Sequence, residues 1–184
     1  MATRRPSLRR FFKGGDGGVL VEIAAVMPLL VILLLGGFEA GRYFMLGQKL
    51  QRVVMTVADL AARSETLSTD DFDDIFAAAG EVARPFALDD GGVIRVSSVR
   101  RPPDAAPIVD WQRAHGTGSA TSRLGTEGET ASLADPALVK EGQGVIVAEI
   151  SFRFEPLLID LFPSQDLYAQ ASFAPRFSKT VALE

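Results

Sequence analysis

A single carboxylate, Glu22, stands inside a long apolar run and is the residue of this sequence best placed to do chemistry. The run extends from Gly17 to Phe38 and holds no other charged side chain. A charge inside a bilayer costs a few kcal/mol even on lenient insertion scales, so it usually marks a function. Opposite charges attract strongly in low dielectric, so Glu22 could pair with a cation, which a plain anchor does not need.

Catalytic side chains are scarce elsewhere in the sequence. His115 is the single histidine and there is no cysteine, so no histidine or cysteine metal cluster and no thiol nucleophile can be built. No phosphate-binding Gly-x-x-x-x-Gly-Lys-Ser/Thr sequence and no dinucleotide fingerprint occurs. The acidic stretch Asp70–Asp74 lacks the central glycine and the distal glutamate of a calcium loop. A membrane-anchored enzyme is therefore disfavoured, and neither a cofactor nor a metal ion is expected.

The apolar run and a basic leader position Glu22. About 20 residues suffice to cross a bilayer as a helix, and the run contains 22. The leader carries five basic residues against one acidic residue, namely Arg4, Arg5, Arg9, Arg10 and Lys13 against Asp16. The positive-inside rule therefore places the N-terminus in the cytoplasm. We predict a cytoplasmic leader over 1–17, a membrane helix over 18–38 and an exported domain over 39–184.

The predicted exported region is acidic, with 14 basic and 21 acidic side chains after Phe38. This balance argues against nucleic acid as a partner, so the basic leader is interpreted as a topology signal. A conventional cleaved signal peptide is disfavoured, because its apolar core is usually shorter and no small-x-small cleavage site follows this run.

The membrane helix is predicted to continue into the exported region. Apolar residues recur there at spacings of three and four, which predicts one helix from Gly18 to about Arg63. These residues are Leu46, Leu50, Val53, Val54, Val57, Leu60 and Ala61. The first half of this helix would lie in lipid, and the second half would pack its apolar stripe against a domain.

Two features of this helix concern its shape and its packing. Pro28 should kink it, because proline removes one backbone hydrogen bond and crowds the preceding turn. The small-residue pairs Gly36/Ala40 and Gly37/Gly41 would let another helix approach closely. Small residues are also common in membrane helices that make no such contact, so both interpretations stay open.

The exported domain is predicted to be a small α+β fold. Ser68 and the acids after it are typical of a helix start, and Arg84-Pro85 would end that helix. Four strands are expected: Val93–Val99, Ile108–Arg113, Val145–Phe154 and Leu167–Ala174. The back half of the long helix would lie across this small antiparallel sheet. The stretch His115–Pro136, rich in Gly, Ser and Thr, is interpreted as a mobile surface loop.

The N-terminal pattern is similar to that of a known family. The matching residues are Gly17-Gly18-Val19-Leu20-Val21-Glu22, Ala24-Ala25-Val26-Met27-Pro28-Leu29-Leu30 and Gly37-Phe38-Glu39-Ala40-Gly41-Arg42. Downstream, the matching segments include Val93–Val99, Gly144–Ile150 and Ala174-Pro175-Arg176. The chain resembles TadE-like proteins, minor pseudopilins of the tight-adherence (Tad/Flp) branch of type IV pili. The resemblance covers nearly the whole chain and implies a pilin-like α+β fold.

The resemblance implies cleavage by a prepilin peptidase after a glycine on the cytoplasmic side. Cleavage between Gly17 and Gly18 would make Glu22 the fifth mature residue, which fits the family pattern. Family members usually carry an aromatic residue after this glutamate, whereas Ile23 stands here. Glu22 could then pair with the new terminal amine of a docked neighbour and set the axial register. The alternative is a carboxylate that reaches back to the membrane interface.

The resemblance predicts a non-enzymatic subunit that helps to start or tip a Tad pilus. Its implied partners are the prepilin peptidase, other pilins or pseudopilins, the Tad inner-membrane platform and the lipid bilayer. Its implied location is the bacterial inner membrane, crossed once with the domain in the periplasm, or the cell surface within a fibre. The alternative is a bitopic assembly factor that stays in the inner membrane and never enters a fibre.

Overall fold

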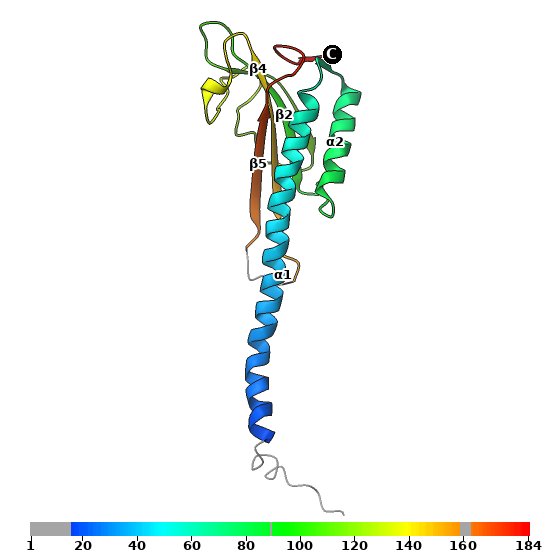
Figure 1. The fold of residues 1–184 in the computed structure, drawn as a ribbon, viewed down its shortest axis with the longest axis vertical. Helices are drawn as coiled ribbons and strands as arrows, with labels where there is room; N and C mark the ends of the chain where they lie inside the picture. Colours follow the sequence, from blue (N-terminus) through cyan, green and yellow to red (C-terminus); the bar gives the residue numbers. More distant parts are fainter. Residues whose placement is uncertain (1–15, 89, 159–162) are drawn as a thin grey trace, which may run out of the picture. The chain divides into compact units, whose positions relative to one another are not determined.

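The computed structural model describes residues 16–88, 90–158 and 163–184. Its helices and strands form the predicted α+β arrangement (Figure 1). The contacts divide the chain into two units. The first comprises Met1–Arg42 and Pro156–Phe162, and the second comprises Tyr43–Glu155 and Pro163–Glu184. Most of the predicted cytoplasmic leader, residues 1–15, lies outside the described residues.

The long helix α1 spans Asp16–Ala61 and confirms the helix predicted from Gly18 to about Arg63. It continues through Pro28, and the kink expected there stays a prediction. Among the described residues, Gly18–Ala61 is the one segment long and apolar enough to cross a membrane, with a mean hydropathy of 2.7 in its most apolar part. Its first half exposes large apolar side chains throughout, as a segment surrounded by lipid would.

A four-stranded antiparallel sheet forms the centre of the second unit. Its strands lie in the order β3-β2-β4-β5. They span Gly92–Arg100 (β2), Ile108–Gly116 (β3), Gly144–Phe154 (β4) and Gln165–Phe173 (β5), which confirms the four predicted strands. The central pair is in register at Val96 opposite Ala148, and both side chains are fully buried. The strands were predicted from the sequence, but the register between them was not.

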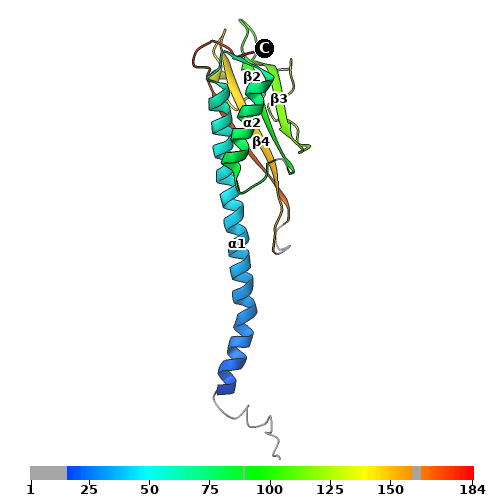
Figure 2. The same cartoon turned by 90° about the vertical axis from the view of Figure 1, so that its right-hand side faces the viewer.

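Helices cover one face of the sheet. The second half of α1 and the helix α2, Thr69–Ala83, lie on the same side of the sheet (Figure 2). Their apolar stripes are buried against it, and the ring of Phe72 meets Trp111 edge to face at 5.7 Å between centroids. The predicted α1 stripe is buried throughout except Leu60, which is partly buried.

The start of α2 was also predicted correctly. Ser68 is the N-cap, and its hydroxyl accepts a hydrogen bond from the Asp71 backbone N–H at 3.3 Å. The Asp71 carboxylate in turn accepts from the Ser68 backbone N–H at 2.8 Å, which completes a capping box. The acids of this stretch therefore begin a helix, and Arg84 is the residue that ends it.

A small parallel pairing near the C-terminal end was not predicted. The strands β1, Thr66–Leu67, and β6, Ala182–Leu183, pair in parallel directly after α1. Beside them the indole N–H of Trp111 donates to the Val181 carbonyl oxygen at 2.8 Å. Two-residue strands leave no periodic pattern in a sequence, so only the folded arrangement shows how residues 181–184 are fixed to the core.

The interpretation of His115–Pro136 as a mobile surface loop was wrong where this stretch packs on the second face of the sheet. Leu124 and Ala131 are buried there, together with Val139, against the valines of β2, β3 and β4. Gly116, at the start of this segment, has a φ of 109°. A Cβ at this position would stand 2.3 Å from the Gly92 carbonyl oxygen. Only glycine fits such a turn, because it combines left-handed φ with close backbone approach.

Candidate functional site on the N-terminal helix

Glu22 lies in the second turn of α1, four residues after Gly18. Residues four apart on a helix face the same side, so an amine at Gly18 would stand one turn from the carboxylate. The Glu22 side chain borders a shallow apolar groove formed by Ile23, Val26, Met27 and Leu30. Its carboxylate makes no hydrogen bond or ion pair with any residue that the structure describes. A charged acceptor thus stands unpaired on an apolar helix surface.

The small residues predicted for helix packing lie along one stretch of the same helix. A Cβ added at Gly36, Gly37 or Gly41 would meet no atom within 4 Å apart from the local helix and adjacent residues. Ala40 lies between them and is partly buried. The described part of the chain therefore does not use this glycine surface for its own packing. The role of these residues and of Pro28 in contacts between helices stays a prediction.

A second carboxylate on α1, Glu39, was not recognised as a site residue. Its side chain is 1% exposed. The Oε1 atom accepts hydrogen bonds from the backbone N–H groups of Leu157 and Leu158, each at 2.9 Å. The Oε2 atom accepts from the Arg42 guanidinium at 2.9 Å. All four residues belong to the first unit, so Glu39 fixes the connection after β4 to the helix.

The sequence carried a signal for this arrangement. Glu39 is the first charged residue after the apolar run, and Arg42 follows three residues later, at helical spacing for an ion pair. An ionised carboxylate that is removed from water needs partners on both oxygens, because the desolvation cost is otherwise uncompensated. The identity of the two backbone donors depends on how the chain folds and could not be predicted from the spacing.

A second buried carboxylate, Glu149, organises the second face of the sheet. It lies on β4, and its side chain is only 3% exposed. It accepts hydrogen bonds from the Ser122 hydroxyl, the Arg123 backbone N–H at 2.9 Å and the Tyr168 hydroxyl at 2.8 Å. The Arg123 guanidinium also stacks 3.9 Å from the centre of the Tyr168 ring. Glu149 therefore anchors the segment after β3 to the sheet.

This environment changes the acidity of Tyr168. Burial of the phenol raises the pKa of Tyr168, and the hydrogen bond to the Glu149 carboxylate and its negative charge raise the pKa further. The Arg123 guanidinium lowers the pKa only in part. The hydroxyl consequently stays protonated and acts as a donor, which is the role that a buried carboxylate requires of it.

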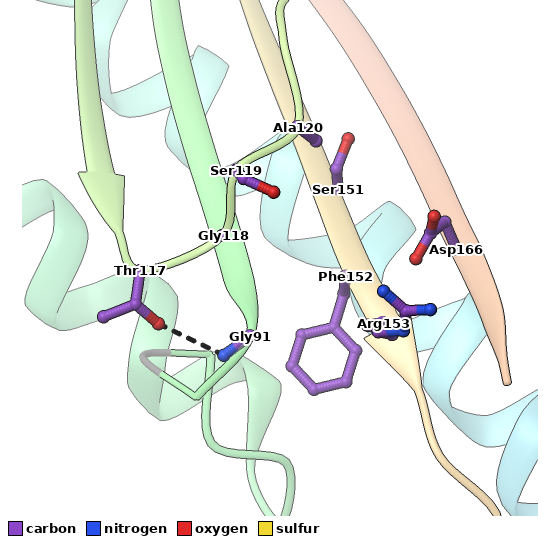
Figure 3. Close-up of a pocket in the computed structure, with 9 residues that line it drawn as sticks. All are labelled: Gly91, Thr117, Gly118, Ser119, Ala120, Ser151, Phe152, Arg153 and Asp166. Carbon is purple, nitrogen blue, oxygen red and sulfur yellow. Dashed lines mark hydrogen bonds between the residues drawn. The ribbon is translucent and has the colours of Figure 1, made fainter.

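A pocket of about 270 Å³ opens beside the start of the segment that follows β3. Figure 3 shows Thr117 beside Gly91 at one side of it, and Arg153 with Asp166 at the other. The Gly91 backbone N–H donates to the Thr117 hydroxyl at 3.2 Å. The lining contains hydroxyl groups but no histidine, so a serine there has no imidazole beside it to act as a base. The lining residues do not form a nucleophile–base pair.

His115 lies elsewhere, next to the last residue of β3. Its exposed ring stacks on Phe76 of α2 with 4.9 Å between centroids and 14° between planes. Among the residues that the structure describes, no group of three or more His, Asp or Glu side chains is arranged to hold a metal ion. His115 therefore packs against the helix layer.

Comparison with protein families supports the resemblance seen in the sequence. A model of the TadE-like protein family matches residues 17–59, which include Gly17, Gly18, Glu22, Glu39 and Arg42. The N-terminal region is therefore similar to that of TadE-like proteins. The curated proteins and the solved structures give no significant match. The family match ends within α1, so it covers the helix and not the sheet.

Proposed function

We propose that this chain is a minor pseudopilin that a prepilin peptidase processes and that helps to start or tip a Tad pilus. The observation that carries this proposal is the Glu22 carboxylate, which lies in a segment with a TadE-like match and makes no hydrogen bond or ion pair with any described residue. A fibre subunit needs a polar group that selects one axial position, because apolar helix packing alone is weakly directional. An inner-membrane anchor of a domain would not need that group.

The pairing step follows from the spacing on α1. Cleavage between Gly17 and Gly18 creates a terminal amine one helical turn before Glu22. When a subunit joins a fibre, its Glu22 can pair with the amine of a neighbour that is already docked. An unpaired carboxylate in low dielectric is costly, so a displaced register loses the pair and is disfavoured. The glycines at 36, 37 and 41 would let helices of neighbouring subunits approach closely.

Mass spectrometry of the mature N-terminus in piliated cells tests the processing step. We expect a chain that begins at Gly18. Replacement of Gly17 by a bulky residue should leave the leader attached, whereas the same replacement at Gly47, outside the apolar run, should not affect cleavage. An intact leader on the wild-type protein in piliated cells would instead support the bitopic assembly factor, which stays in the inner membrane.

The pairing role of Glu22 is tested separately. Glu22→Ala should strongly reduce the number of pili while the protein level in the membrane stays normal. Glu127→Ala is the matched control, because Glu127 is an exposed carboxylate of the second unit. Unchanged piliation in the Glu22→Ala strain would refute the pairing role, even if the N-terminus is processed as expected.

A further inference from the structure

Two leucines at the connection after β4 are exposed although they are apolar. Leu157 is 69% exposed and Leu158 is 53% exposed, and their backbone N–H groups are bound to Glu39. Phe38, the residue before Glu39 on α1, is 54% exposed. Isolated apolar side chains on a surface need no explanation, but these leucines are fixed beside an apolar helix in the same unit. Their position relative to a bilayer decides what covers them.

The length of the helix gives the depth of the two leucines in a bilayer. From Gly18 to Glu39, α1 rises by about 31 Å at about 1.5 Å per residue. The hydrocarbon core of a bilayer is about 30 Å thick. If the chain crosses the membrane as proposed, the Glu39 carboxylate lies at the outer boundary of the hydrocarbon core. Leu157 and Leu158 lie at the same level, because their backbone nitrogens are 2.9 Å from its Oε1 atom.

The hydrogen bonds explain how an irregular segment could enter this boundary. Backbone N–H groups without partners are excluded from lipid, since no water is there to bind them. Glu39 satisfies two consecutive N–H groups, and Arg42 balances the charge of the carboxylate from the next turn. Two backbone N–H groups of this connection are thus bound to the helix, while the leucine side chains remain available to acyl chains.

We propose that Leu157 and Leu158 insert into the outer leaflet of the membrane and form a second contact with lipid beside the helix. The partner is the acyl-chain region of the bilayer, and Glu39 is the residue that holds the two leucines at its depth. This inference depends on the proposed membrane topology. A neighbouring subunit that covers the same leucines would be a different outcome of the test.

The absence of cysteine makes a direct test simple, because each single-cysteine variant carries one spin label. The full-length chain is placed in nanodiscs at one copy per disc. Labels are attached at Leu158→Cys, at Ile32→Cys within the apolar helix, and at Leu138→Cys. Leu138 is a matched control, because it is 62% exposed and belongs to the second unit. The accessibility of each label to oxygen and to a water-soluble nickel complex is then measured.

We expect the ratio of oxygen to nickel accessibility at Leu158→Cys to exceed that at Leu138→Cys severalfold and to approach that at Ile32→Cys. Equal ratios at positions 158 and 138, with position 32 still protected, would overturn the inference and leave the membrane helix intact. A label at 158 that is shielded from both reagents would also overturn it, because protein and not lipid would then cover the site. A water-exposed label at 32 would refute the membrane topology itself.

The role of Glu39 is tested with the same label. Glu39→Ala removes the acceptor of two backbone N–H groups, so the label at 158 should become severalfold more mobile and more accessible to nickel. Glu127→Ala is again the control and should leave both readouts unchanged. Trp111 fluorescence reports whether the second unit remains folded in each variant. Unchanged mobility at 158 in folded Glu39→Ala protein would show that Glu39 does not hold the leucines.

Discussion

Tyr168 on β5 donates its hydroxyl to Oε1 of Glu149 on β4, with 2.8 Å between the two oxygens. The Glu149 carboxylate accepts from three donors. The Tyr168 hydroxyl belongs to the sheet, whereas the Ser122 hydroxyl and the Arg123 backbone N–H belong to the segment that covers it. It is therefore held by hydrogen bonds and not by a direct ion pair. Removal of a donor leaves a buried charge partly unsatisfied, which makes this site sensitive to small changes.

Tyr168→Phe should lower the free energy of unfolding by about 1–3 kcal/mol, because it removes a hydrogen bond to a buried charged group. Denaturant titration followed by the fluorescence of the single tryptophan, Trp111, measures this change. Tyr43→Phe is the matched control at the other tyrosine of the chain, whose ring packs edge to face on Phe154. It should cost under about 0.5 kcal/mol, as most changes outside such networks do. Equal effects of the two substitutions would contradict the role given to the Glu149 network.

Stability should also fall on the alkaline side because of Tyr168. Its pKa in the folded chain is raised above the ordinary value of about 10, so the folded state retains its proton when the unfolded state has lost it. The contribution of Tyr168 is complete below about pH 10 and is lost as the pH rises from the unfolded toward the folded pKa. Unfolding midpoints measured between pH 8 and pH 11 should therefore decline less steeply for Tyr168→Phe than for the wild type. Parallel declines would contradict the prediction.

Asp71 should account for part of the loss of stability at acid pH. Its hydrogen bonds from the backbone and side chain of Ser68 lower the pKa of this carboxyl below its usual value. A group with a lowered folded pKa stabilises the fold fully above the unfolded pKa, about 3.9, and loses this contribution as the pH falls through the folded value. Asp71→Asn should therefore flatten the loss of stability between pH 5 and pH 2. Asp74→Asn, an exposed change in the same helix, should leave the slope closer to that of the wild type.

Ser98→Ala should leave stability unchanged or raise it by up to about 1 kcal/mol. The Ser98 hydroxyl is buried and has no hydrogen-bond partner among the described residues. The neighbouring Ser97 provides the matched control, because its hydroxyl accepts from the Gln112 side chain at 2.9 Å. Ser97→Ala should therefore destabilise by about 1 kcal/mol. Thermal unfolding followed by circular dichroism compares the two. Greater destabilisation by Ser98→Ala would indicate a partner for its hydroxyl.

The elements could be predicted from the sequence because each has a local signal. Spacings of three and four indicated α1, a capping serine followed by acids indicated α2, and alternation along Val145–Phe154 indicated the strand β4. The small β1–β6 pairing escaped prediction, since two residues are too few to form a pattern. The packing of residues 115–136 on the second face of the sheet was not predicted either, because a Gly- and Ser-rich composition does not indicate what a segment packs against.

The partners of the buried carboxylates could not be predicted from the sequence either. Glu22, which is exposed, was singled out because its immediate sequence makes a charge costly, and its role stays a prediction. Glu39 binds backbone groups 118 and 119 residues away, and Glu149 binds groups 26 and 27 residues away. Such partners are set by the fold and not by spacing along the chain. Glu149 was therefore not singled out from the sequence, and the folded chain buries it.

If the second unit is exported as proposed, the pairing of β6 with β1 has a consequence for the order of events during export. Residues 181–184 would be among the last of this sequence to cross the membrane, yet they pair with the strand directly after α1 and receive the Trp111 indole N–H. The second unit would therefore stay incomplete while the chain is still threading outward. Under the proposed topology, such an intermediate would stay open until residue 181 had crossed, and the pairing of β6 with β1 would then complete the second unit.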